Sequence, residues 1–167
     1  LPEAPLTVVR GGGASRVPLL IGTNLDEWRM FTAVDARRRN LDEATLHEYV
    51  ERTFEHERDP VARRREVLEV FELDPETGER RTPAEQWAAL QTARVFGKPA
   101  LDLAEAQASA GGDVWTYRFD WRPMLMRDRL GACHSMEIPF VFGSHGHRAL
   151  WPLIGALPSA RAGQPAE

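Results

Sequence analysis

Several features that would assign a sequence to a class of protein are scarce or missing from these 167 residues. Cysteine occurs once, at position 133, so no internal disulfide can form and the composition is compatible with a reducing compartment. Lysine also occurs once, and the net charge of −4 provides no basic surface of the kind that binds nucleic acid. No apolar run has the length of a membrane-spanning helix. We therefore expect neither a nucleic acid nor a membrane as a partner.

The remaining composition is typical of a globular domain. Hydrophobic residues make up 43% and charged residues 28% of the sequence, and the length is sufficient for one domain with a packed core. The apolar run 17–21 precedes Gly22 and predicts a buried parallel strand that ends at this glycine. Residues 114–121 carry an aromatic residue at every second position, which predicts a strand with one aromatic face. Such a face could stack on bases, but core packing is favoured in the absence of a basic surface.

About four helices are predicted between the two strand patterns. Their expected starts are an N-cap at Asn40 with Glu43 three positions on, Asp59 before Pro60, a capping box of Thr82 with Glu85, and Pro99 after a helix that ends at Gly97. The residues expected to face inward include Val61, Val67, Leu101, Ala104 and Ala108. The arginines at 63–65 are interpreted as a solvated face rather than an anion site. Residues 1–16, which contain prolines and a glycine run, are expected to form a flexible loop, and residues 155–167 a flexible tail.

Two polar segments are distinguished by their chemistry. Glu27 closes the turn after the first strand pattern, and His134 follows a glycine and two small residues. A serine hydroxyl needs a base to take its proton, and that base needs a buried acid to fix its tautomer. An acid that precedes a histidine follows the α/β-hydrolase order Ser…Asp/Glu…His, which would put the nucleophile before residue 1. Taken alone, a histidine between Cys133 and Ser135 is more often structural.

Both segments resemble the type-B carboxylesterase family of α/β-hydrolases, which contains para-nitrobenzyl esterases and cholinesterases. The stretch 22–27 (GTNLDE) resembles the family's G-x-N-x-D-E turn, whose final Glu is the triad acid. The stretch 131–134 (GACH), followed by 137–143 (EIPFVFG), resembles its histidine loop, and 118–121 (RFDW) resembles the preceding strand end. The similarity covers essentially the whole chain in the right order. The family's G-E-S-A-G nucleophile elbow, its glycine-rich oxyanion loop and the helices after the histidine loop have no counterpart here.

The resemblance implies an α/β fold in which residues 1–167 form an incomplete α/β-hydrolase, the C-terminal portion of a mixed, mostly parallel sheet with helices. It implies hydrolysis of a small-molecule carboxylic ester through an acyl-enzyme, with Glu27 as the acid, His134 as the base and no cofactor. The serine would come from the missing N-terminal part of the same hydrolase, so this chain alone is expected to be inactive. A cytoplasmic location is expected, and secretion stays open because the start of the parent protein is missing.

Other assignments remain open for some of these residues. Asp26 competes with Glu27 for the role of the acid, but it is expected instead to cap the turn or the following helix. Glu137 is expected to be structural or to support the site. Cys133 beside His134 could suggest a Cys–His pair, although adjacent side chains on a loop usually diverge.

Three further observations bear on function. His145 and His147 could bind a metal, but two histidines without another ligand are weak evidence. None of the five serines lies in a G-x-S-x-G context, so none replaces the missing nucleophile. The alternative function is non-catalytic, either a truncated product or a cholinesterase-like binding domain. Retention of both Glu27 and His134 argues against a binding domain that has lost its triad.

Overall fold

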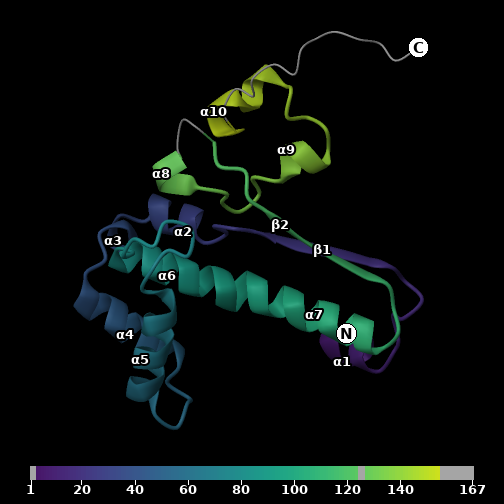
Figure 1. The fold of residues 1–167 in the computed structure, drawn as a ribbon, viewed down its shortest axis with the longest axis horizontal. Coiled ribbons are helices and arrows are strands. Elements are labelled where there is room, and N and C mark those ends of the chain that lie inside the picture. Colours follow the sequence, from purple (N-terminus) through teal and green to yellow (C-terminus); the bar gives the residue numbers. More distant parts are fainter. Residues whose placement is uncertain (1–2, 124–126, 155–167) are drawn as a thin grey trace.

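Two parallel strands form the sheet in the computed structural model, which describes residues 3–123 and 127–154 (Figure 1). Strand β1 (Leu19–Asn24) pairs in parallel with β2 (Val114–Phe119), with Leu19 opposite Val114 and Asn24 opposite Phe119. The predicted parallel strands are therefore confirmed. The other elements are α1 (Pro5–Arg10), α2 (Arg29–Val34), α3 (Ala36–Arg39), α4 (Glu43–Thr53), α5 (Pro60–Phe71), α6 (Pro83–Gln91), the π-helix η1 (Thr92–Gly97), α7 (Lys98–Ser109), α8 (Arg127–Leu130), α9 (Ile138–Val141), the 3₁₀ helix η2 (Arg148–Leu150) and α10 (Trp151–Ile154).

The sheet is less buried than its sequence pattern predicted. β1 continues through Gly22 to Asn24 instead of ending at the glycine. A Cβ at Gly22 would lie 2.5 Å from the ring of Tyr117, so the glycine lets that ring approach the strand. Helix α7 contacts both strands, but Leu20, Trp115 and Tyr117 are 69%, 56% and 43% exposed. The expected burial of the strand is wrong for this face, which lies uncovered in the described part of the chain.

Helices α4, α5 and α6 enclose the first of two hydrophobic cores formed by the described residues. Its buried side chains are those of Leu41, Leu46, Val50, Val67 and Leu90. Leu46 and Val50 lie four residues apart on α4 and therefore share one face of the helix. The inward position predicted for Val67 is confirmed, whereas the one predicted for Val61 is wrong, since Val61 is exposed on α5.

The helix starts are fixed by side-chain caps, as the sequence indicated for two of them. Asp59 accepts a hydrogen bond from the Ala62 N–H (3.0 Å), and Thr82 and Glu85 form the expected capping box. The N-cap of α4 is Asp42, whose carboxylate accepts from the Thr45 N–H (2.7 Å). The cap predicted at Asn40 is therefore wrong, because the Asn40 amide donates to Ala36 O at the end of α3.

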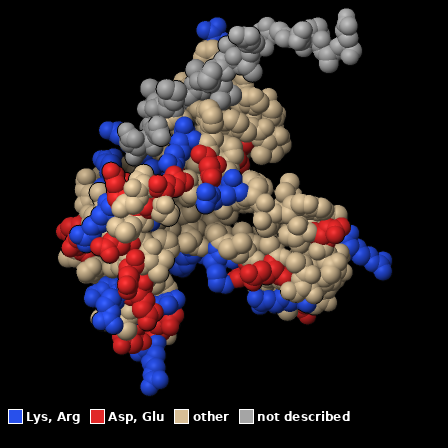
Figure 2. All heavy atoms as spheres, in the orientation of Figure 1, with Lys and Arg blue, Asp and Glu red and all other residues tan. Residues whose placement is uncertain are grey.

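Charged side chains of both signs lie over these helices. Figure 2 shows acidic and basic side chains interspersed over α4 and α5, on the left of the molecule. Two of the three consecutive arginines form ion pairs there, Arg63 with Glu66 (3.2 Å) and Arg64 with Glu51. Arg63 and Arg65 are exposed, as expected of a solvated face, whereas Arg64 is partly buried in its ion pair.

Helices α6, η1 and α7 follow one another without a break and form the longest rod in the molecule (Figure 1). The prediction that Gly97 ends a helix is wrong, because η1 continues through it into α7. Pro99 lies just inside α7, as expected of a proline in a first helical turn. Along α7 the inward position of Ala104 is confirmed, whereas Leu101 and Ala108 are exposed.

The second core lies under the segment after β2. Its buried side chains are Leu130, Cys133, Met136 and Ile154, and Phe119 and Trp121 pack against them. The Trp121 indole N–H donates to Ile154 O at 3.0 Å. Core packing of the aromatic strand is therefore confirmed for its carboxyl end only.

The N-terminal segment is more ordered than predicted. Residues 1–16 were expected to be a flexible loop, but Pro5–Arg10 forms α1, which contacts α7. The side-chain amide of Gln107 on α7 donates to Ala14 O (2.9 Å) and Val17 O (2.8 Å), which fastens the chain before β1. The predicted tail at 155–167 lies outside the described residues. Among the described helices none is both long and apolar enough to cross a bilayer.

The uncovered apolar face predicts that the isolated chain self-associates. We expect it to bind a hydrophobic dye and to elute above its monomer mass, since apolar strand faces and edges without a covering layer favour association. The double variant Leu20→Lys, Trp115→Lys should reduce both the dye binding and the apparent mass. It should leave the melting temperature nearly unchanged, because both side chains are already exposed.

The matched control is Leu46→Ala in the first core. It should lower the free energy of unfolding by about 2–5 kcal/mol without reducing dye binding. A wild-type chain that is monomeric, binds no dye and melts in one sharp transition would contradict the prediction.

Candidate active site

The acid turn (residues 25–28) follows β1 directly and is held by a hydrogen bond to the backbone of the strand end. Glu27 Oε1 accepts a hydrogen bond from the Asn24 N–H (2.8 Å), so the carboxylate folds back onto the strand end. The Glu27 side chain is only 7% exposed. Its backbone carbonyl accepts from the His134 N–H at 3.3 Å, which brings the histidine loop against the turn.

The second carboxylate oxygen of Glu27 reaches the imidazole. Glu27 Oε2 lies 2.7 Å from His134 Nδ1, although the two residues are 107 positions apart in the chain. The His134 side chain is 41% exposed, and Phe31 and Phe96 lie against its ring, with centroids 5.7 and 5.2 Å away. A buried carboxylate on Nδ1 leaves Nε2 as the nitrogen that can exchange a proton with another group.

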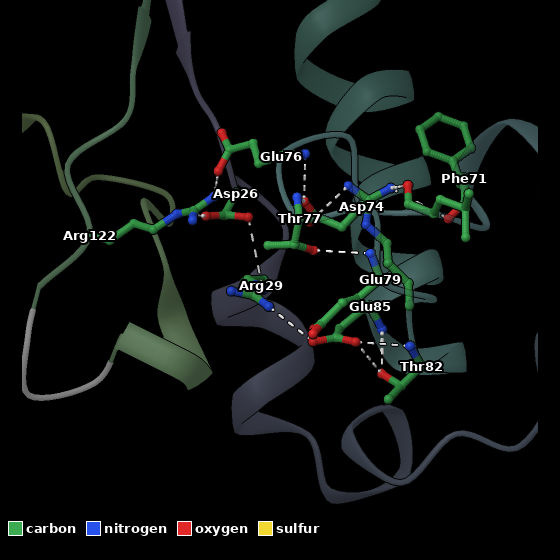
Figure 3. Close-up of polar contacts among 12 residues, drawn as sticks. Asp26, Arg29, Phe71, Asp74, Glu76, Thr77, Glu79, Thr82, Glu85 and Arg122 are labelled. Carbon is green, nitrogen blue, oxygen red and sulfur yellow. Dashed lines mark hydrogen bonds and ion pairs between the residues drawn. The ribbon is translucent and has the colours of Figure 1, made fainter.

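Asp26 points away from the imidazole, toward the backbone of the histidine loop. Its Oδ2 accepts a hydrogen bond from the Ala132 N–H at 3.0 Å and lies 3.6 Å from Arg122 Nε (Figure 3). A Cβ at Gly131 would lie 2.1 Å from the same oxygen, and Gly131 has a φ of +56°, so both space and conformation require glycine there. Asp26 therefore caps the histidine loop, and the expectation that it caps its own turn or the next helix is wrong.

Asn24 and Glu137 join the strand end to the histidine loop. The Asn24 side chain is buried, and its amide donates to Cys133 O (2.8 Å) and to a carboxylate oxygen of Glu137. The supporting role expected of Glu137 agrees with this contact. The bridging role of Asn24 was not foreseen, because its partners lie more than 100 residues further along the chain.

Cys133 and His134 diverge, as adjacent loop residues do. The Cys133 thiol lies in the second core, and burial raises its pKa to about 11, so the thiolate is scarce at neutral pH. Ser135 adopts a φ of +67°, an uncommon conformation for a residue other than glycine. A Cys–His nucleophile is not supported by this geometry.

The two later histidines have separate surroundings. The His145 ring stacks on Phe140, with centroids 5.4 Å apart, and His147 Nδ1 accepts from the Ala149 N–H at 3.4 Å. Within residues 3–123 and 127–154 no three His, Cys, Asp or Glu side chains lie together in a way that could hold a metal ion.

A separate cavity of about 700 Å³ lies beside Asp26, and neither Glu27 nor His134 lines it. Figure 3 shows charged side chains from several elements meeting here, with Arg29 paired to Glu85 (3.2 Å) and Arg122 to Glu76 (2.9 Å). Burial would raise the pKa of Glu85, but hydrogen bonds from Thr82 and the charge of Arg29 outweigh it and lower the pKa below its ordinary value. These ion pairs therefore link α2 to α6, and the segment after β2 to the loop that precedes α6.

Sequence reasoning missed three residues around the acid–histidine pair. Phe31, Thr92 and Phe96 surround the turn and the imidazole, the first from α2 and the other two from η1. The local signals for the η1 residues were Gly97 and Pro99, whose place in an otherwise helical pattern indicates an irregularity.

Comparison with known proteins points to one family. The model of the Carboxylesterase family matches residues 1–151. Para-nitrobenzyl esterase of Bacillus subtilis (strain 168) is 35% identical over 144 residues, 86% of this chain and 26% of the relative. The probable N-octanoylanthranilate hydrolase AqdA2 of Rhodococcus erythropolis is 33% identical over 70 residues, 42% of this chain and 15% of the relative.

Solved structures agree with the sequence relatives. Carboxylesterase EST55 of Geobacillus stearothermophilus, in its pH 6.2 structure, superposes with a TM-score of 0.71 at 32% identity, over 95% of this chain and 30% of that one. Its pH 6.8 structure gives a TM-score of 0.67 at 30% identity, over 93% and 28% of the two chains. The chain thus spans about a quarter of the para-nitrobenzyl esterase and has an incomplete α/β-hydrolase fold. It belongs to the carboxylesterase family.

Proposed function

We propose that this chain supplies the acid and the base of a Ser-Glu-His triad in a carboxylic-ester hydrolase, with Glu27 as the acid and His134 as the base. The observation that carries the proposal is the 2.7 Å contact between Glu27 Oε2 and His134 Nδ1. Burial of the acid and partial exposure of the imidazole support it, because a triad needs a shielded acid behind an accessible base.

The proposed reaction uses the two nitrogens of His134 for different tasks. Nδ1–H donates to Glu27, which fixes the tautomer and stabilises the imidazolium that forms. Nε2 takes the proton of the attacking serine and returns it to the alkoxide leaving group, which departs as the alcohol. The acyl-enzyme is then hydrolysed by water activated through the same nitrogen, and the acid product leaves. These steps require no cofactor.

In this proposal the chain is the C-terminal portion of the hydrolase, and the serine and the oxyanion donors belong to its N-terminal part. The names of the relatives support a small-molecule ester as the substrate class. For the parent enzyme we propose a cytoplasmic location. The free thiol of Cys133, the one cysteine of this chain, agrees with a reducing compartment.

The chain alone is predicted to have no esterase activity and no reaction with a fluorophosphonate probe. The sequence contains no serine in a G-x-S-x-G elbow, and loss of oxyanion donors alone costs about a hundredfold or more. Mass spectrometry after incubation with the probe is the measurement, and the full-length parent is the positive control. Stoichiometric labelling of any serine in this chain would show that the nucleophile lies here after all.

The roles of the two adjacent acids can be separated in the full-length parent. Glu27→Gln keeps the shape but removes the charge and can favour the wrong His134 tautomer. The analogous change in a serine protease lowers turnover by about four orders of magnitude, and we expect a loss of at least about a hundredfold here, with a near-normal melting temperature. The measurement is kcat on a short-chain nitrophenyl ester.

Asp26→Asn is the matched control, since its remaining side-chain oxygen can still accept from the Ala132 N–H. It should cost roughly a kcal/mol or less of stability, as for other caps, and keep turnover within about tenfold. His134→Ala is the inactive reference. If Asp26→Asn is as inactive as His134→Ala while Glu27→Gln stays active, the assignment of the acid is wrong. If His134→Ala itself stays active, the non-catalytic alternative or another base must replace the proposal.

A further inference from the structure

The π-helical segment η1 lies beside the Glu27–His134 pair and has no role in the reaction as proposed above. The Lys98 N–H donates to Ala93 O, five residues back, as in a π-helix. Pro99 has no N–H, and its ring would collide with the carbonyl of residue 95 in an uninterrupted α-helix. The wider turn accommodates the proline, so this irregularity follows from the sequence. Such π turns inside α-helices are frequent at functional sites.

Two side chains of η1 contact the two halves of the pair. Thr92 Oγ1 accepts a hydrogen bond from the Trp28 N–H at 3.0 Å, and Trp28 directly follows the acid Glu27. Phe96 lies against the His134 ring, with centroids 5.2 Å apart and planes inclined by 45°. One turn of one helix therefore contacts both the acid turn and the imidazole.

These contacts restrict the tilt of the imidazole ring, which the hydrogen bond to the acid does not. The bond between Glu27 and Nδ1 fixes one point of the imidazole, which leaves the ring free to tilt about that point. The rings of Phe96 and Phe31 both restrict this tilt, since each packs against the imidazole. Trp28 packs on both phenylalanines, with centroids 4.9 Å from Phe31 and 6.3 Å from Phe96, so the aromatic cluster is held together.

We propose that η1 positions the acid and the base, with Thr92 fixing the acid turn through Trp28 and Phe96 fixing the plane of the His134 imidazole. This inference rests on the proposed function. Neither side chain is required to touch the reacting atoms, so both are positioning residues. Small displacements of a catalytic group lower turnover steeply, whereas binding of a small ester does not depend on the tilt of the imidazole.

The test uses the full-length parent enzyme and a short-chain nitrophenyl ester. Phe96→Ala should lower kcat by about tenfold or more. Thr92→Val, which replaces the acceptor hydroxyl with a methyl group of similar size, should lower it several-fold, with KM within about twofold in both variants. Phe96→Tyr and Thr92→Ser should restore most of the turnover. Val95→Ala is the matched control, because Val95 lies in the same turn with its side chain exposed, and it should behave as wild type.

An independent readout is the NMR signal of the His134 ring protons. It should shift in Phe96→Ala, because the ring current of the phenyl group is lost, and stay unchanged in Val95→Ala. Equal kcat in Phe96→Ala and Val95→Ala, or losses confined to KM, would overturn the inference. If Phe96→Ala does not fold, equal turnover in Thr92→Val and Thr92→Ser would overturn it just as well.

One further variant separates this inference from the proposed function. Activity that survives His134→Ala would remove the proposed base and with it the proposed function. An inactive His134→Ala beside a fully active Phe96→Ala would leave the base in place and refute only the positioning role of η1.

Discussion

The parallel pairing of β1 with β2 is the constraint on which the rest of this structure depends. Parallel strands require a long crossover, and here the crossover contains every helix from α2 to α7. Because both strands run in the same direction, the turn after β1 and the segment after β2 leave from the same edge of the sheet. This geometry brings Glu27 and His134 within hydrogen-bonding distance across 107 residues of chain.

Pairing of the strands alone would leave two loops free to move, and hydrogen bonds from Asn24 and to Asp26 prevent this. The Asn24 side chain donates to the carbonyl of Cys133 in the histidine loop. The Asp26 carboxylate accepts from the N–H of the neighbouring residue, Ala132. The space beside Asp26 is so limited that only glycine fits at position 131. If the loops separated, the buried Asn24 amide and the partly buried Asp26 carboxylate would each lose a hydrogen bond, which makes separation costly. The acid turn and the histidine loop therefore behave as one unit.

Several features decided within a few residues could be predicted from the sequence, whereas most side-chain contacts decided across the chain could not. The caps at Asp59 and Thr82 need only their own first helical turn. The partner of Asp26 lies 106 residues away, and no local pattern indicates it. The sequence predicts a helix end at Gly97, but the helix does not end there, because the π turn η1 leads directly into α7. Glu27 and His134 could be proposed as acid and base because their motifs, and not their spacing, resemble a known family.

The orientation of the acid–histidine pair is built from contacts within this chain. Glu27 is oriented by the backbone of Asn24, and His134 by the carboxylate and the carbonyl of Glu27. None of these contacts involves a nucleophile. Under the proposed function, the rest of the parent enzyme would need to add a serine and oxyanion donors to a base that is already directed by its acid. Pre-orientation of this kind saves the cost of ordering the base at the moment of reaction, which is where enzymes gain much of their rate.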